Sequence, residues 1–181
     1  MKSTSKFVSG ALVTLQRNKN WAEQAIQQTS NENMHKPITA DTNSIVVIMK
    51  HISGNLKSRW TDFLTTDGEK EWRDRDNEFV DDFTSREQLM AVWNEGWDCF
   101  VDSLENLTDE DLTKTIKIRG EDHSVPLAIQ RSLTHTTYHV GQIMLIARAL
   151  FDGEEWQTIS IPKGKSAEYN ETVWGKGHYQ K

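Results

Sequence analysis

The sequence predicts an all-α protein, a four-helix bundle with a small hairpin before the last helix and an irregular C-terminal tail. Apolar residues recur at steps of three and four along four long segments, a spacing typical of amphipathic helices. One long and two moderate connections separate these segments, so the helices can bury their apolar stripes against one another. The expected helices span residues 4–29, 42–65, 85–106 and 125–151, and the tail spans residues 152–181. At 181 residues the chain has the length of one domain, which we expect to span residues 1–181.

The first two segments differ in how clearly they predict a helix. The first has a single apolar stripe that runs from Val8 to Ile26. The second follows a polar loop and is expected to begin near residues 42–43. Its β-branched run at 45–48 is also compatible with a strand, but the stripe continues as far as Phe63, and this length favours a helix.

A charged, aperiodic stretch over residues 66–82 separates the second helix from the third. We interpret it as a long connection, compatible with a crossover between helices. The third helix is expected to begin at Thr84 or Ser85, because each of them forms a capping-box pattern with the residue three positions later. Its apolar face is aromatic and includes Trp93.

The fourth helix follows a short predicted hairpin, in which Ile116 and Ile118 alternate with polar residues. This helix is expected to start after Ser124, with Pro126 tolerated in its first turn. It should stop at Gly153, because glycine commonly follows the last turn of a helix.

The composition excludes several classes of partner. A formal net charge of −6 and a pI near 5.5 argue against a nucleic-acid groove or an anionic membrane surface, because both require clustered Lys and Arg. The longest apolar run, residues 45–49, is far shorter than the roughly 20 residues that a membrane-spanning helix needs. A single cysteine, Cys99, and the polar start of the chain fit a cytoplasmic protein without disulfides or a signal peptide. We therefore expect small molecules or proteins as partners.

Two histidines, His135 and His139, stand four residues apart in the stretch HTTYH. On a helix this spacing places both imidazoles on one face, together with Ile146 and Leu150, so we expect both rings to point into the interior. A buried imidazole needs a hydrogen-bond partner, a charge partner or a metal ion, because its polar nitrogens are costly to bury unpaired. Neutral imidazoles at this spacing can bind one ion at about 2.0–2.1 Å per bond. From the spacing alone, a metal site and a hydrogen-bonded pair in the core both stay open.

A metal site needs a third ligand, and the best-placed candidate is His51 in MKHISGN, which borders the buried stripe of the second helix. The pattern is not that of a HExxH protease, since residue 136 is Thr and no glutamate stands between the two histidines. Nor is it that of a di-iron carboxylate bundle, because the one Glu-x-x-His motif, Glu32 with His35, lies in a loop. Three histidines would leave coordination positions for water or substrate, as in catalytic sites.

The motif HTTYHVGQI on a late helix, with an isolated helical histidine upstream in MKHISGN, resembles the DinB-like superfamily of bacterial metal-binding four-helix bundles. The stretches NLKSRWTDFLTTDGEKEWRDRDNEF, IRGEDHSV and WQTISIPKGKSAEYN resemble one uncharacterised branch of it, so the resemblance spans nearly the whole chain. It implies one divalent ion, zinc, nickel or iron, held by His51, His135 and His139 at one end of the bundle. Many members have arginine directly after the last histidine, where this chain has Val140.

Members of the superfamily with a known activity include thiol-dependent enzymes, among them a mycothiol-dependent isomerase and bacillithiol transferases. The resemblance therefore implies a metal-dependent S-transferase that joins a low-molecular-weight thiol to a small electrophile. A metal-dependent hydrolase and a non-catalytic metal-binding stress-response protein are the alternatives, because a shared fold does not imply a shared function. The resemblance also implies a homodimer.

Other polar residues near these histidines have both a functional and a structural interpretation. Arg59 could bind a carboxylate of a thiol or substrate, or form an ion pair with an acid of the 66–82 connection. Gln142 could bind a water or ligand, or belong to a hydrogen-bond network in the core. Asn55 and Asp62 could orient a histidine, or be ordinary packing and surface groups. The candidate substrate-binding residues are Arg59, Gln142 and Asn55.

Overall fold

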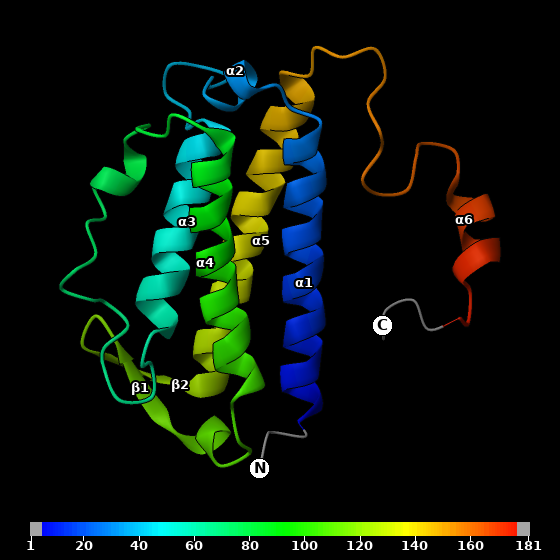
Figure 1. Ribbon diagram of the computed structural model, residues 1–181. Helices are drawn as coiled ribbons and strands as arrows, with labels where there is room; N and C mark the ends of the chain where they lie inside the picture. The colour runs from blue at the N-terminus through cyan, green and yellow to red at the C-terminus, as the bar shows by residue number, and fades with distance from the viewer. Residues whose placement is uncertain (1–4, 177–181) are drawn as a thin grey trace.

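Four long helices form the body of the computed structural model, which describes residues 5–176 of the protein (Figure 1). They are α1 (Lys6–Gln27), α3 (Ile45–Trp60), α4 (Arg86–Glu105) and α5 (Val125–Ala149). The predicted four-helix bundle is thus confirmed. None of the helices in this part of the chain has the length and apolar composition needed to cross a membrane.

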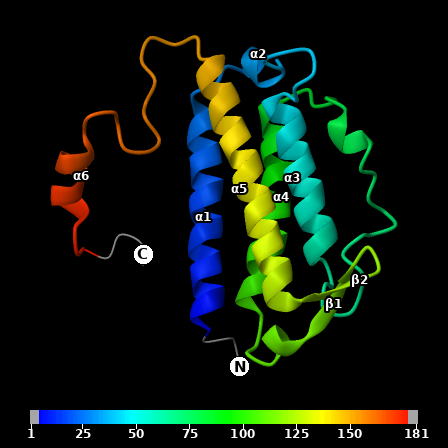
Figure 2. The same cartoon turned by 180° about the vertical axis from the view of Figure 1, so that it is seen from behind.

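The direction of the helices requires one long connection. Helices α1 and α5 run in one direction and α3 and α4 in the other (Figures 1 and 2). Two parallel neighbours such as α3 and α4 can be joined only by a segment that returns along the bundle. Residues 61–85 form this segment, so the crossover that the sequence suggested is present, and it passes beside α3 on its way back (Figure 1).

The interior of the bundle is one continuous apolar core. Trp93, Trp97 and Phe100 of α4 are fully buried in it, which confirms the predicted aromatic face of the third helix. Helices α3 and α4 approach each other closely at Gly96, where an added Cβ would lie 2.6 Å from the Cα of Ser53. Glycine at this position therefore allows the close contact between the two helices.

Serine side chains cap the starts of all four long helices. Each accepts a hydrogen bond from a backbone N–H of the first turn, and the four are Ser5, Ser44, Ser85 and Ser124. The predicted starts at Ser85 and after Ser124 are confirmed. Helix α3 begins at Ile45 rather than at residues 42–43, because Ser44 supplies its cap.

The long helices end earlier than the sequence predicts. Helix α3 ends at Trp60 instead of residue 65, because Thr61 is extended and Asp62 adopts a left-handed conformation with φ of 48°. Phe63 is nevertheless buried, so the apolar stripe continues beyond the helix and misleads a prediction based on periodicity. The other three end one or two residues before their predicted positions, at Gln27, Glu105 and Ala149.

The predicted hairpin is also confirmed, and it lies beneath the cavity described below. Its antiparallel strands are β1 (Thr115–Ile118) and β2 (Glu121–Ser124). The two-residue loop, Arg119 and Gly120, has positive φ at both positions, as tight hairpin turns require. The chain also contains two 3-10 turns among the described residues. The turn η1 (Asn77–Phe79) lies in the crossover, and η2 (Asp111–Thr113) comes directly before β1.

Two short helices lie in segments that were predicted to be irregular. Helix α2 (Asn31–Met34) lies between α1 and α3. Helix α6 (Ser166–Val173) lies in the tail, stands apart from the bundle, and has no buried residue (Figure 1). The earlier part of the tail does contact the bundle, since Trp156 and Ile159 pack against the core.

Candidate metal centre

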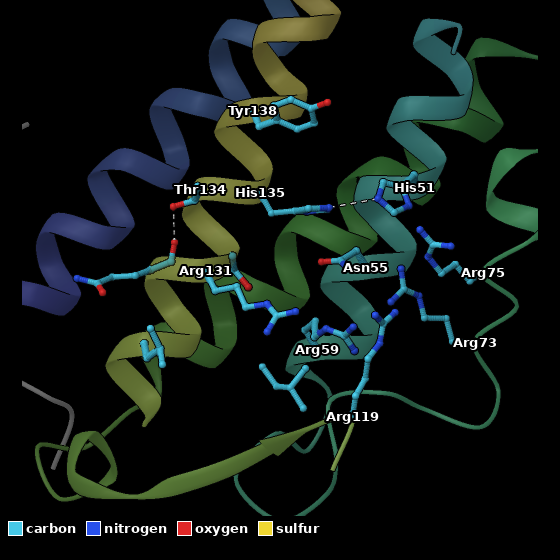
Figure 3. A pocket seen from close by; sticks show the side chains of 14 residues that line it. His51, Asn55, Arg59, Arg73, Arg75, Arg119, Arg131, Thr134, His135 and Tyr138 are labelled. Carbon is cyan, nitrogen blue, oxygen red and sulfur yellow. Dashed lines mark hydrogen bonds between the residues drawn. The ribbon is translucent and has the colours of Figure 1, made fainter. Parts of the chain in front are cut away.

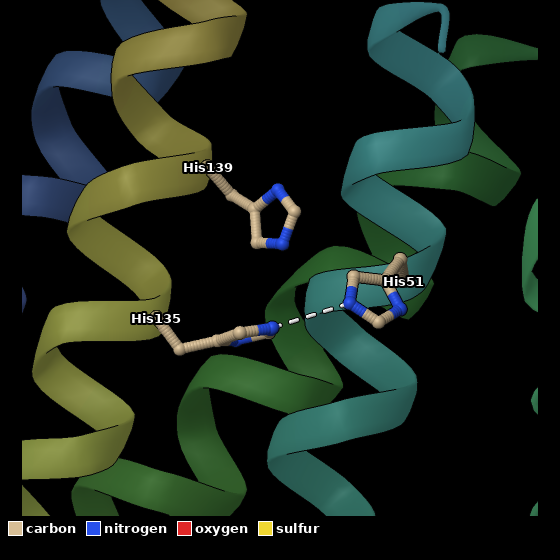
Figure 4. A group of neighbouring side chains, drawn as sticks. All are labelled: His51, His135 and His139. Atoms are coloured by element: carbon tan, nitrogen blue, oxygen red, sulfur yellow. Dashed lines mark hydrogen bonds between the residues drawn. The ribbon is translucent and has the colours of Figure 1, made fainter.

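Three histidine side chains from two antiparallel helices meet at the border of the core. His51 of α3 and His135 of α5 point toward one another (Figure 3), and His139, one turn further along α5, completes the group (Figure 4). The ring centroids are 5.2, 5.0 and 4.6 Å apart. One nitrogen from each ring lies within 4.8 Å of the others, so the three residues form a group that could hold a metal ion.

The spacing of the ring nitrogens is compatible with a single bound ion. His51 Nε2 and His135 Nε2 lie 3.2 Å apart. Two nitrogens that bind one tetrahedral ion at about 2.0–2.1 Å stand about 3.3–3.4 Å apart. A direct hydrogen bond between the rings has a similar length, so the distance alone does not separate the two arrangements.

Hydrogen bonds on the outer side of two rings show which nitrogen carries the proton. His51 Nδ1 lies 2.9 Å from Glu78 Oε2, and His139 Nδ1 lies 2.7 Å from Gln142 Oε1. A carboxylate oxygen and an amide oxygen can only accept, so each Nδ1 donates. A neutral ring with its proton on Nδ1 has a lone pair on Nε2. In His51 and His139 this lone pair is therefore available to an ion between the helices, and the donor set fits a metal centre.

Glu78, the partner of His51, is itself held in place by Arg73. Arg73 Nε donates to Glu78 Oε1 at 2.8 Å, and Nη2 donates to Oε2 at 2.9 Å. Burial by itself raises the pKa of Glu78, but hydrogen bonds from His51 and Arg73, with the charge of Arg73, hold it below its ordinary value. Gly54 leaves room for the carboxylate, since an added Cβ would clash with it. An ionised carboxylate behind a histidine is a common support for a metal ligand.

The surroundings keep the α5 histidines neutral. Burial is the main reason that the pKa of His135 falls to about 3, and the neighbouring histidines and arginines add to it. Burial also lowers the pKa of His139, although the hydrogen bond to Gln142 opposes this change. Neutral imidazole is the form that binds metal ions. The Nδ1 atom of His135 is buried and has no hydrogen-bond partner within residues 5–176.

The sequence predicted that both α5 histidines point into the interior, but they lie at the edge of the core. Thr136 and Val140 are almost completely buried and mark the face of α5 that meets the core. His135 and His139 are partly buried beside this face, toward α3. Val140, the residue directly after the second α5 histidine, is thus part of the core.

A cavity of about 720 Å³ opens beside His51 and His135 (Figure 3). Its walls come from α3, the crossover, the hairpin and α5. Its polar lining consists of amides, hydroxyls, the two imidazoles and the side chains of five arginines, Arg59, Arg73, Arg75, Arg119 and Arg131. The volume is that of a pocket for a small molecule.

Two of the three candidate substrate-binding residues line this cavity. Asn55 and Arg59 both belong to its wall. Arg59 also forms an ion pair with the crossover, with Nη2 2.9 Å from Glu69 Oε2, and it donates to the Gly68 carbonyl. The structure therefore contains the predicted ion pair between Arg59 and an acid of the 66–82 connection. It also places Arg59 in the wall of the cavity that His51 and His135 line.

Gln142 and Asp62 have other surroundings. Gln142 accepts from His139 and donates to the Tyr138 hydroxyl at 3.1 Å, and it is not part of the cavity lining. Asp62 is exposed in the turn after α3. Tyr138 is 61% exposed and also lines the cavity.

Glu78 and the arginines other than Arg59 were not among the residues predicted from the sequence. Glu78 lies 27 positions from His51, in a connection without periodicity, and only the return of the crossover along α3 brings the two together. The one signal was the length of this charged connection, which is unusual unless the segment has a role.

The chain matches a family model described as Protein of unknown function (DUF1572) over residues 2–165. No curated protein and no solved structure matches the chain. The matched range includes the three histidines, the crossover and the hairpin. Because the match covers nearly the whole sequence, the chain belongs to the DUF1572 family.

Proposed function

We propose that this protein binds one divalent metal ion through His51, His135 and His139, and that its family is a branch of the DinB-like superfamily. The observation that carries the proposal is the pair of outer hydrogen bonds from His51 to Glu78 and from His139 to Gln142. These bonds place both protons on Nδ1 and leave Nε2 free to bind an ion. Zinc, nickel and iron all accept imidazole ligands, so the donor set is compatible with each.

We further propose that the site is catalytic. Structural zinc sites are usually closed by four protein ligands, whereas catalytic sites keep a position for water or substrate. Here two of the three histidines, His51 and His135, line a cavity of about 720 Å³, which supports access for a small molecule. A metal ion bound there would act as a Lewis acid and lower the pKa of a thiol or water.

The reaction we propose is the transfer of a low-molecular-weight thiol to a small electrophile. The thiol sulfur forms a bond to the electrophilic carbon, the thiol proton is released, and the leaving group departs with the bonding electron pair. The groups that line the cavity, mainly arginines, amides and hydroxyls, are suited to bind and orient a substrate. A thiol that coordinated such an ion would be deprotonated outright, whereas a bound water keeps a pKa of about 7, so the site would present a thiolate nucleophile at neutral pH.

The chain's own residues would divide the remaining tasks. Arg59 and Asn55, in the wall of the cavity, would contact the substrate. Gln142 would act as a positioning residue, because its amide oxygen is already used by Nδ1 of His139. Glu78 would have the same positioning role toward His51.

The test begins with the metal content of protein purified without chelators. We expect about one ion per chain in the wild type, and loss of that ion in the variant H135A/H139A. The matched control is His35→Ala, since His35 lies outside the site and pairs with Asp81 on the surface. Equal metal content in the wild type and the double variant would contradict the proposed centre.

Activity is tested with a low-molecular-weight thiol and a generic alkylating electrophile, before and after removal of the metal. Conjugation that depends on the metal and disappears in H135A/H139A would support the transferase. Metal-dependent cleavage of esters or amides without thiol conjugation would overturn it in favour of a hydrolase. A metal-loaded protein with neither activity across a broad panel would overturn catalysis itself and leave a binding protein.

A further inference from the structure

The cavity beside the histidines has a strongly basic side that the metal centre does not explain. Five arginines line it, and they come from α3, the crossover, the hairpin loop and α5. Figure 3 shows Arg131 of α5 extending toward the side where Arg59, Arg73 and Arg119 gather. Arginine side chains repel one another, so such a cluster needs either enough internal carboxylates or an external anion.

One carboxylate holds two of these guanidinium groups side by side. Arg59 Nη2 and Arg119 Nε both donate to Glu69 Oε2, at 2.9 and 2.7 Å. Asp67 stabilises the same arrangement, because its carboxylate accepts hydrogen bonds from the backbone N–H groups of Arg119 and Gly120. The hairpin loop is thereby fixed against the crossover, and the two guanidinium groups are held before any ligand arrives.

Arg73 is buried and not fully satisfied. Its side chain is 2% exposed and forms the bidentate pair with Glu78 described above. Its remaining terminal nitrogen, Nη1, is buried without a hydrogen-bond partner among the described residues, and lies 3.7 Å from the Glu69 carboxylate. A buried donor without an acceptor is costly unless a ligand or water supplies one.

The other two arginines are positioned without being neutralised. Arg131 Nη1 lies 3.0 Å from His123 Nε2, while His123 Nδ1 lies 3.0 Å from the Glu121 carbonyl. His123 must donate to that carbonyl, so its Nε2 accepts from Arg131 and the ring is neutral. Arg75 lies over the Phe79 ring, with 5.4 Å from its guanidinium carbon to the ring centroid, and within residues 5–176 it has no ion pair.

We propose that this arginine-lined side of the cavity is a binding subsite for a doubly charged oxyanion, either a phosphate or a pair of carboxylates, carried by the small molecule on which the histidine centre acts. Glu69 and Glu78 pair with Arg59, Arg73 and Arg119, while Arg75 and Arg131 have no carboxylate partner among the described residues. The five guanidinium groups therefore exceed the two carboxylates by three positive charges, enough to neutralise a bound dianion. Guanidinium groups bind such oxyanions bidentately and recognise their planar oxygen pairs.

The link between this subsite and the histidines rests on the proposed function, but anion binding itself needs no metal. In the substrate, the acidic group would lie toward Arg59, Arg119 and Arg131, and the reacting atom toward His51 and His135, which line the same cavity. The site would therefore select acidic small molecules and hold them in one orientation.

The test uses the full chain after metal removal, so that anions cannot bind to a metal ion. Inorganic phosphate and succinate are titrated separately by calorimetry at low ionic strength, because salt screens such interactions. The variant is R119Q/R131Q, in which both replaced side chains are on exposed residues and neither contacts the three histidines directly. The matched control is Arg148→Gln, which lies on α5 outside the cavity.

We expect the wild type and R148Q to bind one of the two dianions with equal affinity, and R119Q/R131Q to bind it at least tenfold more weakly. Whichever dianion binds more tightly identifies the group as phosphate or dicarboxylate. The absence of binding by both dianions, or an equal loss of affinity in R148Q, would overturn the subsite. Metal content, measured on the same variants, separates the two proposals: R119Q/R131Q should keep its ion, and H135A/H139A should keep its anion affinity.

Discussion

Glu78 orients His51, so its replacement should weaken metal binding without removing any metal ligand. The Oε2 atom of Glu78 accepts the Nδ1 proton of His51 at 2.9 Å, and both groups are almost fully buried, with side chains 7% exposed. In Glu78→Gln an amide oxygen can still accept this proton, but the negative charge is lost. In Glu78→Ala the acceptor itself is lost.

The expected magnitude follows from that single contact. A hydrogen bond to a charged group contributes about 1.5–3 kcal/mol, and a factor of ten in affinity corresponds to about 1.4 kcal/mol. Loss of such an outer partner typically lowers metal affinity by about 10–100-fold. We therefore expect the affinity to fall in the order wild type, E78Q, E78A, with about tenfold for E78Q and about a hundredfold for E78A.

Affinity is measured by competition with a chromogenic zinc chelator at neutral pH. Both variants also leave the buried Arg73 without its full ion pair, which destabilises the fold by up to about 3–5 kcal/mol when a partner is removed. The titration is therefore carried out well below the unfolding temperature of each variant. Glu95→Gln is the matched control, because Glu95 is exposed and pairs with Lys57 of the same helix as His51. Equal affinity in the wild type and E78A would refute the role of Glu78.

Three further predictions concern the stability of the fold. Asp111→Asn should lower the free energy of unfolding by about 1 kcal/mol at neutral pH. Hydrogen bonding from Lys114 is the main reason that the pKa of Asp111 falls from 3.8 to about 2, so this contribution is complete above about pH 4, and the difference between variant and wild type in urea unfolding should vanish as the pH falls toward 2. Gly96→Ala should destabilise the protein by about 1–3 kcal/mol, because the new Cβ would lie 2.6 Å from the Cα of Ser53. Gly10→Ala, where nothing lies within 4 Å, should instead stabilise α1 by up to about 1 kcal/mol, and thermal melts of the two variants test the contrast. Zinc at a hundred times its dissociation constant should raise the free energy of unfolding by about 2.7 kcal/mol, and a chelator should reverse the shift.

Local sequence signals predicted the helices well because helix formation depends on nearby residues. The apolar stripes, the capping pattern at Ser85 and the start after Ser124 all have structural counterparts. The end of α3 was placed too far along the chain, because Phe63 continues the apolar pattern after the backbone has left the helix at Thr61. Periodicity reports which side chains are buried, and burial does not require a helix.

The candidate site was predictable only in part, for a related reason. The spacing of His135 and His139 is local and visible in the sequence, and His51 could be chosen because it borders an apolar stripe. Glu78 and Arg119 belong to the site through contacts between distant segments, which no local pattern encodes. The direction of the crossover and the position of the hairpin decide which charged residues face the histidines.

The most direct test of the metal centre is an anomalous-scattering crystal structure of the zinc-loaded protein. We expect one zinc peak at about 2.0–2.1 Å from Nε2 of His51, His135 and His139, with the Nδ1 atoms of His51 and His139 still hydrogen-bonded to Glu78 and Gln142. Zinc bound elsewhere would contradict the proposed centre. So would a structure without zinc between the three histidines, in which His51 and His135 are still hydrogen-bonded to each other.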